Sequence, residues 1–475
     1  MFDELQRIIE KGESLGADYI DARYDELLPR TIIKENGRIT QLKTMNRTGV
    51  GFNVYYNGAS AYAFSADISN PKALEQAALD ALGIAKATSN KVIVKSEIDP
   101  RSPVKISLEP KIRDPAWLAE PERKLDLINR MESTAKDHGK DINSLLLMYG
   151  ELSGKKIFTN SDGTEIKWSP YISDLRCIVV SKTPEGDLVR ASDGCGGSYG
   201  LEYYKRDGST PEDLGRNAAL WAKEQLKAKS APPGEFRALC ENTLVGVLAH
   251  ESFGHLTEAD FIVTKGSPIH DKVGEKLGSD LVTIIDEGVS EFNGKSTPLY
   301  LPYDDEGVKT TRTVLMEDGI LKNFLTSRST SKLLNTEYSG NARAINFAFP
   351  PIPRMKNTYF TPGDMTEEEA LEQLGTGIYA IRTSGGQVEG SGDFLFKAVR
   401  GYWVENGEKK YPLKDVSLTG NILDLLTKIE GATKDFELSS GYFGGCGKGG
   451  QFPLPVGDGG PKLVFEKVRF GGESK

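Results

Sequence analysis

The composition and charge of this 475-residue chain exclude several classes of protein. A formal net charge of −9 without a basic cluster argues against binding of DNA or RNA, because Lys and Arg must neutralise the phosphates. No stretch approaches the roughly 18 consecutive apolar residues of a membrane span, and the acidic N-terminus lacks the regions of a secretory signal. We therefore expect a cytoplasmic protein with neither a nucleic-acid nor a membrane partner.

Predicted helices and strands alternate in the first half of the chain. Helical patterns and caps predict helices at residues 2–9, 71–85, 125–138 and 211–229. Extended patterns predict strands at residues 19–24, 31–34, 50–56 and 61–64, and several more between 145 and 180. Asn36-Gly37 and Asn57-Gly58 are typical of hairpin turns. His138 lies in the last turn of its helix, where the helix dipole favours a cation, so we expect it to be structural.

The second half is predicted to be mostly β. At this length two or three domains are expected, and Ser230-Ala231-Pro232-Pro233-Gly234 is the best candidate for a boundary. Beyond it, short extended runs are separated by turns such as Asp318-Gly319, Asn406-Gly407 and Thr419-Gly420. We predict an α+β fold: an N-terminal α+β domain at 1–230, then a domain dominated by antiparallel sheet at 231–475.

One six-residue segment constrains the function more than any other. The chain has only 4 histidines, and two of them lie in His250-Glu251-Ser252-Phe253-Gly254-His255. Two neutral imidazoles and an adjacent carboxylate are what hydrolytic zinc chemistry needs, namely two ligands and a base. The segment is similar to the His-Glu-x-x-His zinc signature with one extra residue. The alternative is a pair of buried, hydrogen-bonded and inert histidines.

The extra residue has a geometric consequence. Residues i and i+5 point about 140° apart on a regular α-helix, so His250 and His255 cannot both face one metal from such a helix. Either a π-type turn restores a common face, or the helix ends at Gly254 with positive φ. We expect Asn242 or Thr243 to cap the helix at its start.

A catalytic zinc usually has three protein ligands, and the sequence leaves two candidates for the third. His270 lies in a loop-like stretch, whereas Cys446 lies between glycines that permit close approach of the backbone. Lys448 and a metal would both favour the thiolate form of Cys446. The 4 cysteines show no CxxC spacing, so we expect no disulfides.

Together these segments resemble the TldD/PmbA family of metallopeptidases, and specifically its zinc-bearing TldD branch. The histidine motif is followed by Glu258 and Asp260, as in the family. Further matching segments occur in the same order: Asp304-Asp305-Glu306-Gly307, Gly319-Ile320-Leu321, Gly340-Asn341, residues 353–358, residues 401–405, residues 446–451 and Pro455-Val456-Gly457. The resemblance is strongest from about residue 232 onward.

The resemblance implies a complete site and an assembly. His250, His255 and Cys446 would hold zinc, and Glu251 would be the catalytic base. Small or unfolded peptides would be cleaved inside an enclosed dimer, either a homodimer or a heterodimer with a PmbA-like subunit. Glu258 and Asp260 could orient a zinc ligand.

Three further polar residues have two interpretations each. Asp304 and Asp305 either orient a zinc ligand or hold a peptide amine, or else they form a solvated turn. Arg354 either grips a peptide carboxylate or is a surface arginine between strands.

Three functions remain open. The favoured one is a zinc peptidase with Glu251 as general base. The second is a non-catalytic member that binds peptides or a partner and uses zinc only structurally, with four protein ligands. The third is a cysteine peptidase with Cys446 as nucleophile, which would need a base and an orienting group nearby.

Overall fold

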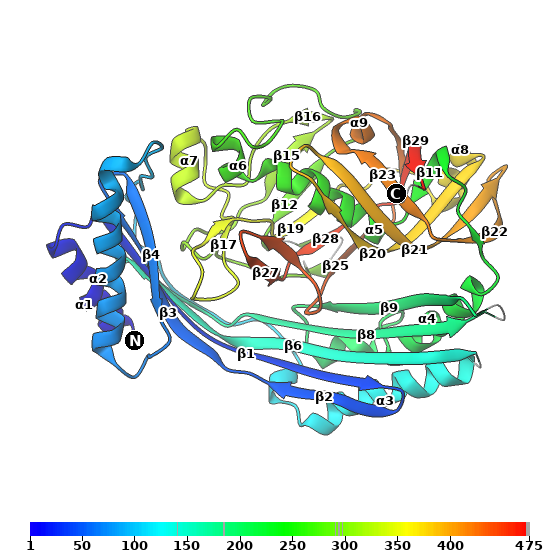
Figure 1. Cartoon of the computed structure of the whole chain (residues 1–475), viewed down its shortest axis with the longest axis horizontal. Helices are drawn as coiled ribbons and strands as arrows, with labels where there is room; N and C mark the ends of the chain where they lie inside the picture. The colour runs from blue at the N-terminus through cyan, green and yellow to red at the C-terminus, as the bar shows by residue number, and fades with distance from the viewer. Residues whose placement is uncertain (140, 184–185, 290, 293–294, 297, 472–475) are drawn as a thin grey trace.

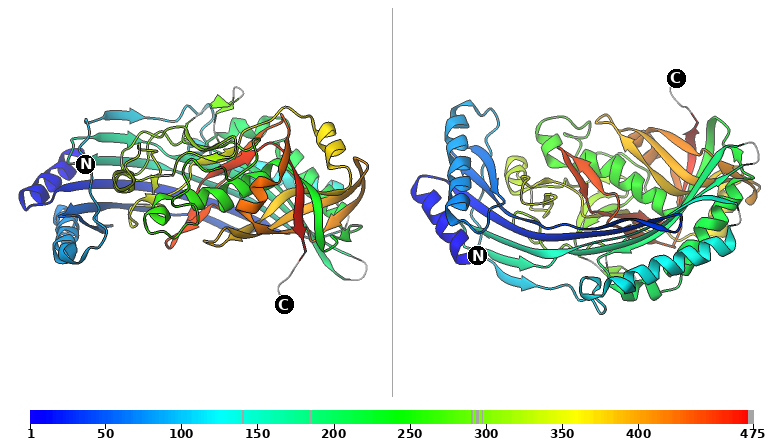
Figure 2. Two further views of the ribbon diagram at one scale, coloured as in Figure 1. Left: turned by 90° about the horizontal axis from the view of Figure 1, so that it is seen from above. Right: turned by 60° about the horizontal axis from the view of Figure 1, so that its bottom comes forward.

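A long, curved sheet from the first part of the chain carries the rest of the molecule on its concave side (Figures 1 and 2). The structure, a computed structural model, describes residues 1–471 except 140, 184–185, 290, 293–294 and 297. No helix within these limits combines the length and the apolar composition that crossing a membrane requires.

Nine strands form the curved sheet within the described part of the chain. They are β1 (Tyr19–Glu35), β2 (Arg38–Thr44), β3 (Arg47–Tyr56), β4 (Ala59–Ser65), β5 (Lys105–Leu108), β6 (Ile142–Asn160), β7 (Glu165–Trp168), β8 (Tyr171–Lys182) and β9 (Leu188–Gly197). The predicted runs 19–24 and 31–34 are parts of the single strand β1, because the residues between them pair with β6. Both predicted hairpin turns are confirmed, since Asn36, Gly37, Asn57 and Gly58 all have positive φ.

Helices cover the convex face and one end of this sheet (Figure 2). They are α1 (Phe2–Ser14), α2 (Pro71–Thr88), η1 (Ser89–Lys91), η2 (Ala116–Leu118), α3 (Pro121–His138), η3 (Leu201–Lys205) and α4 (Pro211–Gln225). Asn70 caps α2 as expected, its side chain accepting a hydrogen bond from the N–H of Lys72. His138 bonds the carbonyl of Thr134, 2.9 Å away, in agreement with a structural role. The helix predicted to reach residue 229 ends at Gln225.

Alternation along the strands divides the curved sheet into two faces. Leu147 and Tyr149 on β6 and Leu175 and Cys177 on β8 belong to one apolar core with α3 and α4. Because successive side chains point to opposite faces, the alternate residues, such as Asp174 and Arg176 on either side of Leu175, face the second half of the chain. The sheet therefore presents polar side chains to its concave side.

Two further sheets make up most of the second half. One contains β10 (Lys229–Ser230), β11 (Gly234–Cys240), β20 (Gly377–Val388), β21 (Asp393–Glu405), β22 (Glu408–Lys414), β23 (Ser417–Asn421), β24 (Ile429–Ala432) and β29 (Leu463–Phe470). The other contains β12 (Ile284–Glu287), β15 (Thr313–Glu317), β16 (Ile320–Leu321), β19 (Asn357–Phe360), β25 (Glu437–Ser440) and β28 (Gly457–Gly460). The predicted boundary near residue 230 lies between β10 and β11, which both belong to the first of these sheets.

Short elements complete this half. The two-stranded pairs are β13 (Glu291–Phe292) with β14 (Lys295–Ser296), β17 (Ala342–Arg343) with β18 (Ile352–Pro353), and β26 (Cys446–Lys448) with β27 (Gln451–Leu454). The helices are α5 (Asn242–Val247), η4 (Leu248–Gly254), η5 (His255–Thr257), α6 (Ala259–Val263), α7 (Arg328–Leu334), α8 (Glu367–Leu374) and α9 (Ile422–Thr427).

The predicted α+β fold is confirmed, and antiparallel pairing dominates the second half. Parallel pairing occurs between β11 and β20, β10 and β22, and β19 and β28. The turns at Asp318-Gly319 and Asn406-Gly407 have the expected positive φ. Thr419-Gly420, however, lies inside β23 and pairs with β21, so the prediction of a turn there was wrong. The main apolar core of this half includes residues of α5 and η4, so the helix that carries the histidine motif packs against it.

Candidate metal centre

The histidine motif adopts a π-helix. α5 continues into η4, a π-helix, and the N–H of His255 bonds the carbonyl of His250 five residues earlier. A π-turn brings residues i and i+5 to a common face, so the two imidazole rings lie 5.3 Å apart between centroids. One of the two predicted geometries is therefore confirmed. The other was wrong, because Gly254 has φ −55° rather than a positive φ.

Gly254 is needed for space instead. A Cβ at Gly254 would lie 2.1 Å from Sδ of Met355, and one at Gly246 would lie 2.5 Å from the backbone nitrogen of Gly459. The start of α5 also differs from the prediction, since neither Asn242 nor Thr243 caps it. Glu241 is the cap, accepting from the N–H of Thr243 at 3.1 Å, and the Asn242 side chain binds the carbonyl of Gly460 instead.

Three potential ligand atoms converge beside this π-helix. One atom each from His250, His255 and Cys446 lie within 4.8 Å of one another, and this is the only such group that the described residues form. Sγ of Cys446 lies 3.2 Å from Nε2 of His255. Both ring nitrogens of His250 are buried without a hydrogen-bond partner among the described residues. A buried polar group normally has a partner, and a metal ion bound by one of these nitrogens would supply it.

The thiol reaches this position through an unusual turn. Gly444 and Gly445, just before Cys446, have φ +90° and +125°, a region that favours glycine. His270, the other candidate for third ligand, does not join the group. Its Nδ1 lies 3.0 Å from the carbonyl of Ser267 and its Nε2 lies 4.0 Å from Asp271.

The three groups change each other's protonation. Burial alone would raise the pKa of Cys446, but His250 and His255 outweigh it and hold the pKa well below its usual value. Burial would lower the pKa of His255, but Glu258 and Cys446 raise it well above its usual value. The thiol is therefore favoured as a thiolate, the form that binds metals.

Glu258 orients one of these histidines. Its buried carboxylate accepts a hydrogen bond from Nδ1 of His255 at 2.8 Å, which directs Nε2 toward Cys446. Nζ of Lys448 lies 3.0 Å from the same carboxylate and 2.7 Å from Asp260. Burial would raise the pKa of Glu258, but His255 and Lys448 lower it below its usual value. Lys448, expected to act on the thiol, thus pairs with the carboxylates of Glu258 and Asp260.

Two more carboxylates lie close to the histidines. Oε2 of Glu251 lies 3.7 Å from Nε2 of His255, and its side chain is 28% exposed, so solvent reaches it. Asp458 on β28 was missed by the sequence reasoning. Burial raises the pKa of Asp458 to about 6, although the charge of His250 partly opposes the rise. Only the packing of β28 beside α5 brings it here.

The acidic run lies elsewhere and is not a solvated turn. Asp304 is buried and accepts hydrogen bonds from the backbone of Glu306, Val308 and Ala342. Asp305 accepts from the backbone of Ala344 and from Lys156 on β6. None of the contacts of these two carboxylates involves the histidine–cysteine group. The interpretation of Asp304 and Asp305 as a solvated turn was therefore wrong. Their contacts give no support to orienting a zinc ligand, and binding of a peptide amine stays a prediction. Through Asp305 and Lys156 the run joins the second half of the chain to the curved sheet.

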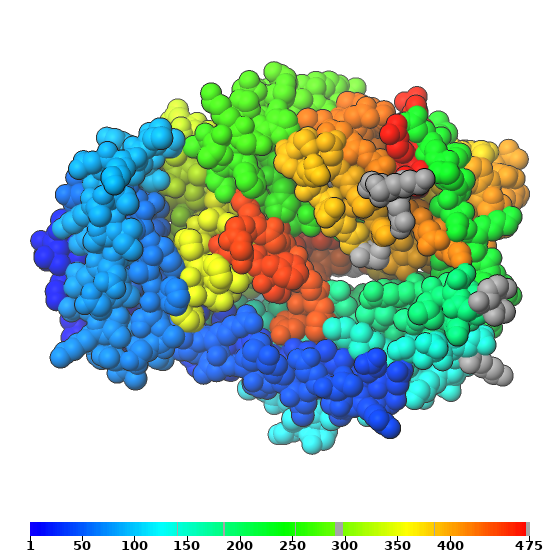
Figure 3. All heavy atoms as spheres, viewed as in Figure 1, coloured from blue at the N-terminus to red at the C-terminus, as the bar shows by residue number. Residues whose placement is uncertain are grey.

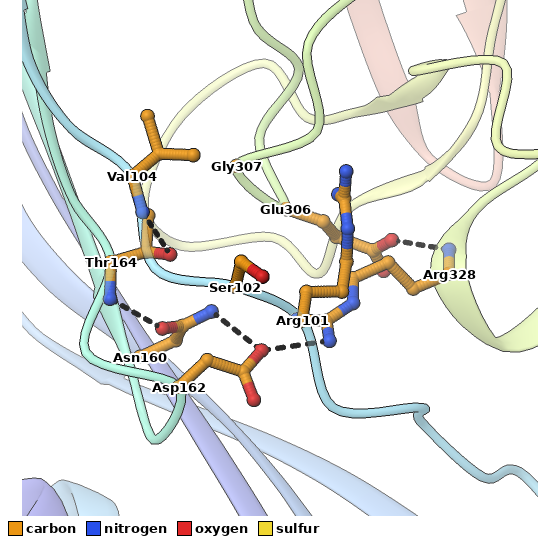
Figure 4. A pocket seen from close by; sticks show the side chains of 9 residues that line it. All are labelled: Arg101, Ser102, Val104, Asn160, Asp162, Thr164, Glu306, Gly307 and Arg328. Atoms are coloured by element: carbon orange, nitrogen blue, oxygen red, sulfur yellow. Dashed lines mark hydrogen bonds and ion pairs between the residues drawn. The ribbon is translucent and has the colours of Figure 1, made fainter.

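A small pocket marks this junction (Figure 4). The side chain of Arg328 binds Asp162 while its backbone N–H donates to Glu306, so one residue ties the acidic run to the curved sheet.

Arg354 is also buried, with no exposed surface, and its Nε lies 4.0 Å from Glu258. The interpretation of Arg354 as a surface arginine was therefore wrong, whereas binding of a peptide carboxylate stays a prediction.

Comparison with known sequences identifies relatives along the whole chain. Three parts of the chain match domains of the PmbA/TldA metallopeptidases: domain 1 at residues 30–85, the central domain at 114–226 and the C-terminal domain at 233–472. A metalloprotease of Methanocaldococcus jannaschii is 36% identical over 478 residues, 96% of this chain and 97% of the relative. A zinc metalloprotease TldD homolog of Saccharolobus solfataricus is 29% identical and covers 98% of this chain and 99% of its own.

Solved structures show the same fold. A putative modulator of a DNA gyrase from Thermotoga maritima has a TM-score of 0.78 at 23% identity, covering 99% of both chains. TldE from Thermococcus kodakarensis has a TM-score of 0.79 at 17% identity, covering 99% of this chain and 100% of its own. Sequence, fold and donor set together define the class of protein, a metallopeptidase. This chain belongs to the PmbA/TldD metallopeptidase family.

Proposed function

We propose that this protein is a zinc-dependent peptidase in which His250, His255 and Cys446 hold the metal. The observation that carries this proposal is the convergence of three donor atoms within 4.8 Å, with both ring nitrogens of His250 otherwise unpartnered. A zinc ion held by these three residues would supply a Lewis acid for a peptide carbonyl.

Glu251 serves as the general base. Its carboxylate is adjacent to the histidines and partly exposed, so it can take a proton from the attacking water and later pass it to the leaving amine. Glu258 holds the imidazole of His255 in one orientation. The site therefore brings together a base, three metal ligands and a group that orients one of them.

The same atoms also suit a cysteine peptidase. Sγ of Cys446 lies 3.2 Å from Nε2 of His255, and Glu258 orients this histidine. Each group therefore contacts the next, as nucleophile, base and orienting group would. That reaction would leave His250 and Glu251 without a role, which is why we favour zinc. A purely structural zinc would normally have a fourth protein ligand, and within the described residues the group offers three.

We further propose that the substrates are small or unfolded peptides and that the enzyme works as a cytoplasmic dimer, with itself or with a PmbA-like subunit. The hollow between the curved sheet and the second half (Figure 3) would admit an extended chain more readily than a folded protein. All 4 cysteines are described and free, which agrees with a reducing compartment. Native mass determination of the unreduced protein tests the dimer and the absence of interchain bridges.

Zinc content and peptide hydrolysis, measured together on the wild type and on Glu251→Ala, test the mechanism. Loss of a general base costs about 100- to 10,000-fold in rate, while the metal should remain. A chelator should abolish wild-type activity and zinc should restore it. Unchanged hydrolysis by Glu251→Ala, or activity that survives chelation but not alkylation of Cys446, would favour the cysteine peptidase instead.

A further inference from the structure

The segment that carries Cys446 to the metal site also touches the curved sheet. Residues 441–445, here called the anchor loop, join β25 to β26 and lead directly into Cys446. In Figure 3 the orange-red part of the chain reaches down from the upper half of the molecule to the blue and cyan strands. Both histidines, in contrast, lie on η4 and η5 within the core of the second half.

The contacts of the anchor loop follow one row across three strands. Thr31 on β1 pairs in register with Gly150 on β6, which pairs with Asp174 on β8. Oγ1 of Thr31 lies 3.1 Å from the hydroxyl of Tyr442. At the other end of the row, Asp174 accepts a hydrogen bond from the N–H of Phe443 at 3.0 Å.

Arg176, two residues along β8, completes the attachment. It donates a hydrogen bond to the carbonyl of Phe443, and its guanidinium lies 5.8 Å from the centre of the Phe443 ring. Its Nε also donates to Asp174 at 3.0 Å. The backbone N–H and C=O of Phe443 are thus both held by side chains of the curved sheet.

Glycines make room for the close packing of the anchor loop on the curved sheet. A Cβ at Gly150 would lie 2.1 Å from Cδ1 of Tyr442, and a Cβ at Gly441 would lie 2.3 Å from Oδ2 of Asp174. Gly445 is confined as well, because a Cβ there would lie 2.5 Å from the carbonyl oxygen of Leu454. The loop is therefore held closely on both sides of the residues that precede Cys446.

We infer that Asp174 and Arg176 are positioning residues for the metal site: the curved sheet holds the anchor loop so that the thiolate of Cys446 completes the ligand set. This inference rests on the proposed role of Cys446 as a ligand. Two ligands are preset by the π-helix, whereas the third is placed by side chains of the other half of the chain. Metal affinity should consequently depend on residues that touch neither the metal nor its ligands.

The test uses the whole protein, with zinc affinity measured by competition with a chromophoric chelator. Cobalt(II) replaces zinc in a second measurement, because the thiolate-to-cobalt charge-transfer band reports the Cys446–metal bond. Asp174→Ala should weaken zinc binding about tenfold and reduce this band. Asp174→Asn, which retains an oxygen acceptor for the N–H of Phe443, should recover part of both. Arg176→Ala, at a partly exposed position, should act in the same direction and carries the test if Asp174→Ala does not fold.

Asp193 on β9 provides a matched control. It is also buried and also bridges the two halves, with Oδ1 3.2 Å from Arg382 on β20, but it does not contact the anchor loop. Asp193→Ala should leave zinc affinity within about twofold of wild type, as expected for a site with no shared partners. Equal weakening by Asp193→Ala, or wild-type affinity and charge-transfer band in the folded Asp174 and Arg176 variants, would overturn the positioning role.

Cys446→Ala separates this inference from the proposed function. If that substitution weakens zinc binding and removes the charge-transfer band while Asp174→Ala changes neither, the positioning role alone is wrong. If Cys446→Ala binds zinc like the wild type, the proposed ligand set fails, and the positioning role fails with it.

Discussion

Glu258 shows how one buried carboxylate organises several charged groups. It has no exposed surface, and it pairs with His255, with Lys448 and, more distantly, with Arg354. Burying a charge is costly unless opposite charges compensate, and here the partners offset the cost for one another. Substitution of Glu258 would therefore remove the hydrogen bond that orients His255 and would leave Lys448 and Arg354 without this anionic partner. Its effect on the site would combine the loss of all three contacts.

At the same scale, the identity of the third ligand can be tested directly. We expect Cys446→Ala to lower the zinc content of the purified protein sharply, because one of three donors is lost. His270→Ala should leave zinc near the wild-type level, since His270 bonds Ser267 and lies outside the group. Metal analysis after dialysis measures both. The reverse result would assign the third ligand to His270.

At the scale of the element, the π-helix depends on two close approaches by glycines. Gly246 lies against Gly459 on β28, and Gly254 lies against Met355. A regular α-helix would separate the imidazoles, so whatever keeps η4 in π geometry also keeps the two ligands together. Burial in the core, where Leu248 and Phe253 are enclosed, provides that constraint.

Gly254→Ala tests this dependence. The added Cβ meets Sδ of Met355, so we expect a loss of stability of about 1–3 kcal/mol, as for other overpacked cores, together with weaker zinc binding. Shortening Met355 to Ala in the same chain should recover part of the zinc affinity. Chemical denaturation and chelator competition give the two quantities. Wild-type zinc affinity in Gly254→Ala would show that the packing of Gly254 is irrelevant to the site.

Gly83 in α2 serves as the matched control for that substitution. A Cβ there meets nothing within 4 Å, and the residue lies in a helix. We expect Gly83→Ala to stabilise the protein by about 0.5–1 kcal/mol, because alanine loses less backbone entropy than glycine in a helix. Zinc affinity should not change.

At the scale of the whole molecule, charged side chains join the two halves. Arg328 from the second half binds Tyr19 and Asp162 of the curved sheet, and Lys156 of the sheet binds Asp305. Such buried polar contacts specify how the halves fit, although each charge loses hydration. The junction should therefore respond to pH.

The pKa of Asp21 determines whether stability rises or falls with pH. Burial, only partly opposed by Arg328, raises its pKa from 3.8 to about 7. Between these pKa values the folded protein keeps a proton that the unfolded chain has released, so the stabilisation falls as pH rises from about 4 to about 7. We expect the melting temperature to drop from pH 5 to pH 8, and to drop less in Asp21→Asn. The exposed Asp67→Asn should follow the wild type. An equal drop in Asp21→Asn would contradict the role of Asp21.

Local patterns in the chain predicted the features whose causes are local. Hairpins at Asn36-Gly37 and Asn57-Gly58 require positive φ, which those residues adopt readily, and the cap at Asn70 acts on its own helix. The histidine spacing, combined with helix geometry, required a departure from the α-helix between His250 and His255. The sequence left His270 and Cys446 as candidates for the third ligand, and the resemblance to a known family favoured Cys446.

Tertiary packing decided the rest. The choice of π-helix over a terminated helix depends on burial of this segment in the core of the second half, and Asp458 approaches His250 only because β28 packs beside α5. The acidic run Asp304–Gly307 has the composition of an exposed turn, yet it is buried: Lys156 on the curved sheet, distant in sequence, pairs with Asp305, and backbone N–H groups bind Asp304. Sequence determines local backbone preference and donor chemistry, whereas burial and pairing of charges depend on which distant segments the fold brings together.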